Sequence, residues 1–526
     1  MIGRRTAWTL TATLVALLPV AACGGSENCA EDNRCPTAGS GGSGASGAGG
    51  DGAQGGQGGT GGSLPAGCEA SPIEDGSVIK DECGVFVSVT AAAGGDGSQA
   101  KPFRTLGEGV AKAGAKRIYV CGAQTFEEAV ELDGDELVGG LRCEDGSWAY
   151  EGGEAAKRTL LAPADSGTIA LRINGGGATV AGLSVLAPEG STPGDSSIAV
   201  LVDGGAAKIT DCDLEAQDTA DGAEGEAPTG TGDPGIEGDK GVDGMCMTAG
   251  NLGGSGGEKT CDAMDVSGGP GGGGTNGSTG APGGPGSGTP GPPPDDGAAG
   301  SGQSAAACGV GHTGGPGGNG SAGTGAAGIG TLSSEGFLAS PATDGAGPGL
   351  PGQGGGGGGG AKECGSDTTK AGPSGGGGGS GGCGGARGKA GQSAGSSIGL
   401  VSASGTVTLT RVTITTGTAG KGGNGGDGQE GGNGGQPGPA GASGACPGGI
   451  GGKGGNGGPG GGGHGGHSLA IAWQGASPSL NDATLTAGNA GDGGIGGDGD
   501  TTETVIGGNG QGCKTLDFGS NTCVND

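Results

Sequence analysis

Apolar residues recur at the same offsets in four segments that align without gaps: 168–188, 197–217, 397–417 and 468–488. Within each segment they form three clusters, separated by small or polar residues. Short alternating runs bounded by turn residues are typical of β-strands, so each segment predicts three short strands joined by tight turns. The aligned apolar positions are Ile169, Ile198, Ile398 and Leu469, then Leu171, Val200, Leu400 and Ile471, then Val180, Ile209, Leu409 and Leu480, and finally Val185, Leu214, Ile414 and Leu485.

One copy of this repeat cannot bury its apolar side alone, whereas stacked copies can. A period of about 20 residues with strand–turn–strand–turn–strand content predicts the coils of a parallel β-helix, an all-β solenoid. Alternation within each strand would send every second side chain inward. Leucine-rich repeats are disfavoured because their Leu/Asn signature is absent, and a β-sandwich would not repeat the same offsets.

The chain before the repeats predicts further strands and one short helix. A β-branched and aromatic run at 85–89 favours a strand, 94–99 a turn and 105–113 a helix. The helix would cap the first coils, so that 67–217 forms the N-terminal part of the β-helix with its cap. Later strands are expected at 117–121, 128–132, 136–138 and 158–161.

The four copies start 29, 200 and 71 residues apart, and Gly-rich insertions fill the two longer spacings. The insertions span 218–396 and 418–467, single coils lie at 397–417 and 468–488, and a Gly-rich segment with a Cys-containing tail spans 489–526. Such Gly-Gly-Xaa sequence is either disordered or packed as polyglycine II helices with three residues per turn. Because ordering Gly costs entropy, packed helices would need support from the scaffold and from disulfides.

Composition narrows the range of functions. Gly supplies 151 of 526 residues and aromatic residues are only 2% of the chain, whereas about 7% Gly is usual. With 24 basic and 54 acidic residues the formal net charge is −30. A polyanion of this size repels nucleic acid, so no nucleic-acid partner is expected.

The first residues have the order of an export signal, basic at 1–5 and apolar at 8–20. The apolar run is shorter than the roughly 20 residues that a membrane-spanning helix needs. It therefore predicts a signal peptide, residues 1–22. The run ends at Val20-Ala21-Ala22-Cys23-Gly24, which resembles a bacterial lipobox, so we expect lipid on Cys23.

The lipid would hold the mature chain on a membrane. Segment 23–66 is rich in Gly, Ser and Ala, which predicts a flexible tether. Gly24, rather than Asp, follows the lipidated Cys, and this favours the outer membrane. The expected location is therefore exported, lipid-anchored in the outer membrane and surface-exposed.

Cysteine usage agrees with export. The chain has 16 Cys, and in an exported protein these predict disulfides rather than reduced thiols. Lipidation of Cys23 leaves an odd number, which implies one free thiol or one intermolecular bridge. The short-range pairs expected are Cys29 with Cys35, Cys68 with Cys83, Cys121 with Cys143, and Cys513 with Cys523.

Candidate metal ligands are sparse, and no cofactor is expected. Asp427 and Asp498 end two Gly-Gly-Xaa-Gly-Xaa-Asp matches, the start of a repeat that binds Ca²⁺ in secreted β-rolls. The apolar residue due at the eighth position is missing in both, and the copies are not in tandem, so Ca²⁺ is a weak candidate. His464 and His467 have no nearby carboxylate or Cys set that resembles a tetrahedral site.

Catalytic groups are also weakly indicated. Asp211 and Asp213, with Lys208 and Arg172 near in sequence, are the residue types that a polysaccharide lyase would use. Asp211, however, aligns with Gly182 and other residues between two strands, which is simpler to read as a turn position. We therefore predict no catalytic residues, with a lyase as the alternative.

The opening of the ordered part resembles known proteins. Runs 85–89, 101–106 and 117–121, followed by 125–130, resemble the start of pectin-lyase-like right-handed β-helix proteins. Residues from Cys68 to about Asp218 resemble the ordered part of large Gly-rich, PGRS-like lipoproteins of myxobacteria. The resemblance implies a right-handed β-helix on a surface-exposed outer-membrane lipoprotein, and it implies no enzyme activity.

Taken together, these features predict a non-enzymatic cell-surface lipoprotein whose β-helix displays Gly-rich loops. Adhesion, envelope structure or matrix contact is the expected role. Its partners would be the membrane, through the lipid, and extracellular polysaccharide or neighbouring surface proteins. The alternative is a carbohydrate-active β-helix, either lyase-like or a polysaccharide-binding module.

Overall fold

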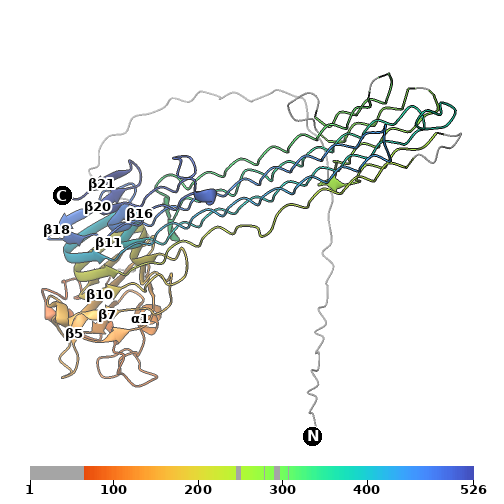
Figure 1. Ribbon diagram of the computed structural model, residues 1–526. Helices are drawn as coiled ribbons and strands as arrows, with labels where there is room; N and C mark the ends of the chain where they lie inside the picture. Colours follow the sequence, from red (N-terminus) through yellow and green to blue (C-terminus); the bar gives the residue numbers. More distant parts are fainter. Residues whose placement is uncertain (1–63, 244–249, 278, 289–295, 306) are drawn as a thin grey trace, which may run out of the picture. The chain divides into compact units, whose positions relative to one another are not determined.

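The computed structural model describes residues 64–243, 250–277, 279–288, 296–305 and 307–526 (Figure 1). The signal peptide, Cys23, most of the tether and the expected Cys29–Cys35 pair lie outside these ranges. Among the described residues the protein is mostly strand, with one α-helix, as expected of an all-β chain.

The strands form one large sheet and two small hairpins. The large sheet has 17 strands, paired in parallel except for β5–β6 and β20–β21. The helical elements are η1 (Gly76–Val78), α1 (Leu106–Ala113), η2 (Ala155–Lys157) and η3 (Gly497–Gly499); the strands are β1 (Gly84–Val87), β2 (Arg117–Cys121), β3 (Thr125–Phe126), β4 (Val130–Leu132), β5 (Asp135–Arg142), β6 (Ala149–Tyr150), β7 (Thr159–Leu161), β8 (Leu171–Ile173), β9 (Ala178–Ala181), β10 (Leu183–Leu186), β11 (Ser197–Ala216), β12 (Thr260–Cys261), β13 (Met264–Asp265), β14 (Thr331–Ser333), β15 (Gly336–Leu338), β16 (Ser397–Thr416), β17 (Ser468–Trp473), β18 (Ser479–Asn481), β19 (Thr484–Thr486), β20 (Gly512–Asp517) and β21 (Thr522–Val524).

Helix α1 begins where the sequence supplies a capping box. The Thr105 hydroxyl accepts a hydrogen bond from the Glu108 N–H at 3.1 Å, and the Glu108 carboxylate accepts one from the Thr105 N–H at 3.3 Å. Gly109 lies against β1, where a Cβ would come within 2.7 Å of Val87. The expected helix is therefore confirmed, with Thr105 as its N-cap rather than its first residue.

Strand register confirms the alignment of the four copies. Val200 of β11 pairs with Leu171 on one side and Leu400 on the other, and Leu400 pairs in turn with Ile471. The second and third clusters pair in the same way. Their inward side chains build one apolar core, except that Leu480 of β18 is exposed instead of buried as predicted. The tail adds one rung more than the alignment contained, because β20 pairs in parallel with β17.

The prediction of three short strands per copy is wrong for the second and third copies, which run on as the single strands β11 and β16. In every copy the corner before the last apolar cluster nevertheless uses a left-handed backbone. Gly182, Asp211, Arg411 and Asp482 occupy equivalent places, with φ of 67°, 53°, 53° and 54°. Positive φ is uncommon outside Gly, and Asp is among the residues that tolerate it best. Asp211 is thus a turn residue, as its alignment indicated.

The described parts of the Gly-rich insertions are ordered, so the ordered one of the two alternatives is observed. Every third N–H of one segment donates to the next segment: Gly235 to Asn433 O at 2.7 Å, Gly238 to Gln436 O at 3.0 Å. Three residues per turn without internal hydrogen bonds is the periodicity of polyglycine II. We call these threefold segments glycine helices; in Figure 1 they are the long segments drawn mainly in green and blue-green.

Gly content follows the number of neighbours of each glycine helix. In the all-Gly run 354–360 successive N–H groups donate to three different segments, and successive carbonyls accept from three more. A Cβ on any residue of 355–360 would lie 1.9 to 2.2 Å from a backbone oxygen. In Gly-Gly-Xaa helices the third residue, such as Lys421, is exposed instead. The run thus has six neighbouring segments. Three of them accept its hydrogen bonds, at the carbonyls of Gly379, His312 and Gly284, and three donate to it, from the N–H groups of Gly269, Gly449 and Gly300.

Candidate functional site

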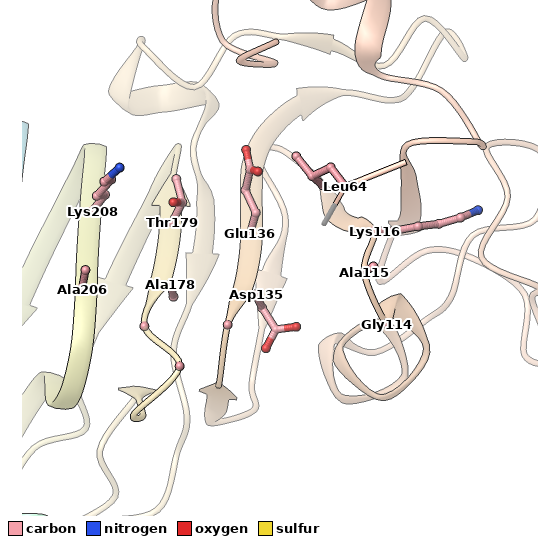
Figure 2. A pocket seen from close by; sticks show the side chains of 13 residues that line it. Leu64, Gly114, Ala115, Lys116, Asp135, Glu136, Ala178, Thr179, Ala206 and Lys208 are labelled. Carbon is pink, nitrogen blue, oxygen red and sulfur yellow. The ribbon is translucent and has the colours of Figure 1, made fainter. Parts of the chain in front are cut away.

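One row of polar side chains crosses the outer face of the coil sheet. Glu136 on β5, Thr179 on β9 and Lys208 on β11 are register partners on neighbouring strands. Parallel strands lie about 4.8 Å apart, so Glu136 and Lys208 are separated by roughly two strand spacings, with Thr179 between them. Figure 2 shows the three side chains side by side on successive strands.

This row lines a cavity of about 270 Å³. Leu64 and the turn Gly114–Lys116 form one wall beside Glu136 (Figure 2). Gly134 and Gly177, both in the left-handed region with φ of 89° and 74°, line the cavity at the turns that precede β5 and β9. The site is thus built from strands held in register by the apolar core beneath them.

Some of the charged side chains around the cavity have partners within the protein and others do not. Arg117, only 2% exposed, pairs with Glu136 at 2.7 Å, while its Nη1 atom is buried without a hydrogen-bond partner. Burial alone would lower the pKa of Arg117, but the Glu136 carboxylate outweighs it and the pKa is raised. Lys116 donates to Asp81 O at 2.7 Å. Lys208 forms no ion pair within the described ranges, so it is the ammonium that a ligand could reach.

Chemically, the row offers a carboxylate, a hydroxyl and an ammonium in a line. Such a set can accept and donate hydrogen bonds to the hydroxyls of a small polar ligand and attract an anionic group to Lys208. Sequence reasoning named Lys208 only as a neighbour of the lyase candidates and did not find the row. The signal was present in the aligned copies but needed the register with β5, which lies outside them.

The lyase candidates do not converge on this cavity. The Asp211 carboxylate accepts two hydrogen bonds from Arg411, at 2.6 and 3.0 Å, and one from the Tyr150 hydroxyl at 3.0 Å. Burial alone would raise the pKa of Asp211, but these hydrogen bonds outweigh it and the pKa is lowered. Asp213 pairs with Arg158 at 2.5 Å. Arg172 donates to the Ser334 carbonyl.

The weak Ca²⁺ candidates serve the backbone instead. Asp427 accepts a hydrogen bond from the Asp498 N–H at 2.5 Å, and Asp498 itself has φ of 57°. Burial and the charges of Asp427 and Asp500 raise the pKa of Asp498. Within the described ranges no group of three or more His, Cys, Asp or Glu side chains is arranged to hold a metal.

Acidic side chains cover the edge of the glycine helices. Asp218 and Asp221 accept hydrogen bonds from the outward N–H groups of Thr418 and Lys421, both at 2.6 Å. Glu224 does the same for Asn424 at 3.0 Å. These carboxylates satisfy backbone donors that would otherwise face solvent, and they leave the edge negatively charged.

Disulfides connect both parts of the molecule. Cys68–Cys83, Cys121–Cys143 and Cys513–Cys523 are present, three of the four pairs expected from the sequence. Sequence spacing did not indicate Cys261–Cys383 or Cys308–Cys446, which span 122 and 138 residues and join parts of the Gly-rich insertions that only the fold brings together. Cys212 is a free thiol, buried in the core, and burial raises its pKa to about 12.

In the part of the chain that the structure describes, no helix has the length and apolar character needed to cross a membrane. Comparison with protein-family models, with curated proteins and with solved structures finds no match to this chain.

Proposed function

We propose that this protein is a non-enzymatic cell-surface lipoprotein that presents a bundle of glycine helices for adhesion, envelope or matrix contact. In this proposal the coils form a right-handed parallel β-helix, and the insertions are polyglycine II helices that it displays. The observation that carries the proposal is that the described Gly-rich segments are ordered rather than disordered. About half of the chain after residue 22 lies in the Gly-rich segments, and their described residues form a hydrogen-bonded bundle.

The bundle has the properties of a stiff display element. At about 3.1 Å per residue a threefold helix such as 420–441 extends roughly 70 Å. Neighbouring helices hold one another through backbone hydrogen bonds, and the Cys261–Cys383 and Cys308–Cys446 bridges tie them covalently. Stiffness of this kind holds contact residues at a fixed distance from the coils, which a disordered loop would not do.

Membrane attachment through Cys23 is tested by replacing it. The variant Cys23→Ser should move the protein from the membrane fraction to the soluble fraction, whereas the matched variant Ser26→Ala should remain on the membrane. Protease added to intact cells should degrade the wild-type protein if it faces outward. Retention of Cys23→Ser on membranes would contradict the anchor, and protection from protease would contradict surface exposure.

A second function is favoured by the row of Glu136, Thr179 and Lys208. We propose that this cavity binds a carboxylate-bearing sugar unit of an extracellular polysaccharide, with Lys208 at the carboxylate and Thr179 and Glu136 at ring hydroxyls. Calorimetry with uronate oligosaccharides should show binding that weakens about tenfold in Lys208→Gln, since a charge-assisted hydrogen bond contributes about 1.5–3 kcal/mol.

The matched control is Lys421→Gln, which removes an exposed ammonium on the glycine helices and should leave binding unchanged. Equal weakening in both variants would mean that only net charge is sensed. Absence of binding to any uronate would contradict this second function. Ultraviolet absorbance of an unsaturated product would contradict the non-enzymatic proposal.

A further inference from the structure

Strands β14 and β15 form a hairpin that belongs to none of the coils. They pair in antiparallel fashion from Thr331 to Leu338 and lie outside the coil sheet. We call residues 329–340 the strap. Its Leu332 is buried and its Phe337 is half-buried against a second apolar cluster, separate from the core inside the coils. The cluster on the coil side consists of Ile198, Leu201, Ile398, Val401, Ala403, Leu469, Ala472, Cys513 and Leu516.

Side chains from the Gly-rich insertion and from the coils bind the backbone carbonyls of the strap. The Ser393 hydroxyl donates to Ser340 O at 2.6 Å, and Gln474 Nε2 donates to Leu332 O at 3.4 Å. Near the start of the strap His467 Nε2 lies 3.0 Å from Ile329 O. The strap is thus fixed by a few polar contacts around an apolar centre.

His467 is satisfied only as a neutral ring. Its Nδ1 atom accepts a hydrogen bond from the Gln511 N–H at 2.9 Å, so the proton must be on Nε2, which donates to Ile329 O. The ring therefore ties together the strap, the start of β17 and the segment that leads into β20. A second proton would place two donors, Nδ1–H and the Gln511 N–H, against each other.

The surroundings offer no compensation for a positive charge. His467 is fully buried, and the ring centroids of Phe337, Phe518 and His464 lie 5.4, 6.3 and 5.2 Å from its own. The backbone N–H groups of His464 and His467 donate to the hydroxyls of Ser393 and Ser396. Among the described neighbours from the strap, β17 and the segment before β20, the only other titratable group that acts on His467 is His464.

The direction of the effect follows from burial. Burial, reinforced by His464, lowers the pKa of His467 from 6.5 to about 4, and burial also lowers the pKa of His464. An unfolded or released strap leaves both rings at their ordinary values, so release is accompanied by proton uptake. The strap is therefore held fully above pH 6.5 and is progressively weakened as the pH falls from 6.5 towards 4.

We propose that His464 and His467 form a proton-sensitive latch, which releases the strap in acid and exposes the apolar cluster on the outer face of the coils. The coils themselves keep their core and their disulfides. A surface protein of this design would change from a polar to an apolar outer face upon acidification. The chain has 3 His, and the third, His312, is exposed on a glycine helix, which provides a matched control.

Hydrogen exchange read by mass spectrometry tests the latch on the mature chain. After correction for intrinsic exchange, protection of peptide 329–338 should fall at least tenfold between pH 6.5 and 4, while peptide 407–414 of the coils stays protected. The variant His312→Asn should behave like wild type. The double variant His464→Asn, His467→Gln should show no acid-dependent step.

Three outcomes would overturn the latch. They are a strap that stays protected to pH 3.5, a strap that opens together with the coils, and an acid step that persists in the double variant. If the double variant does not fold, the wild-type protein still decides the question, because the His467 ring can be titrated by NMR. A pKa near 6.5 for His467 would refute the latch, and a value near 4 would support it.

Discussion

At the scale of single residues, glycine is needed in the bundle mainly because neighbouring backbones lie very close, and not because the chain must be flexible there. Few of the crowded glycines of the bundle need a positive φ; they are required because a neighbouring backbone occupies the space of a Cβ. At Gly357 that Cβ would lie 1.9 Å from Pro270 O, whereas at Gly347 it would meet nothing within 4 Å. Identical residues in the same bundle therefore have different roles.

This difference predicts opposite results for two identical substitutions. Gly357→Ala should destabilise the bundle by about 1–3 kcal/mol or more, because a buried methyl group must displace backbone. Gly347→Ala should be neutral or stabilise by up to about 1 kcal/mol, since alanine restricts the unfolded chain. Thermal unfolding of the two variants measures the difference. Equal stability of both would show that the glycine helices are not closely packed.

Residue patterns predicted the corner of the coils but not its chemistry. Asp211 was identifiable as a turn residue because it aligns with Gly182 and Arg411. Its bidentate pair with Arg411 was not, since the two residues lie 200 positions apart. The same limit applies to Asp427 and Asp498, whose motif suggests Ca²⁺ while their position in the bundle makes Asp427 an acceptor for backbone N–H.

At the scale of elements, periodicity predicted the strands well and the layers around them less well. The strand at 117–121 was correct to the residue, and the strand at 136–138 lies in the first half of the longer β5. Alternation placed Ile198 inside the coils together with Val200. In the structure Ile198 packs in the outer cluster under the strap, while Val200 packs inside. The β14–β15 hairpin, about 130 residues further along the chain, covers Ile198, and no local sequence pattern indicates this contact.

The glycine helices show why order or disorder could not be decided from sequence. A Gly-Gly-Xaa run has the same local preferences in both states, and one threefold helix has no internal hydrogen bonds. Order depends on whether neighbours exist at the correct register. Gly235 needs Asn433, and Gly355 needs Gly379, and these distances along the chain carry no sequence signal of their own.

At the scale of the whole molecule, coils and bundle share one register. The 200-residue offset that pairs β11 with β16 continues beyond the strands, where Asp218 and Asp221 bond to Thr418 and Lys421. The coils thus set the alignment of the glycine helices that leave them, which offsets part of the entropy cost of ordering Gly. Such a design joins a small apolar core to a much larger polar bundle.

Residue-resolved amide exchange of segment 448–463 tests this account most directly. The N–H groups of Gly451, Gly452, Gly454 and Gly455 donate to neighbouring helices, whereas those of Ile450 and Lys453 have no acceptor within the described ranges. We therefore predict that within 448–455 exchange is slow at two residues of every three, with Ile450 and Lys453 exchanging at least a hundredfold faster. Uniformly fast exchange across the segment would contradict an ordered bundle of threefold helices.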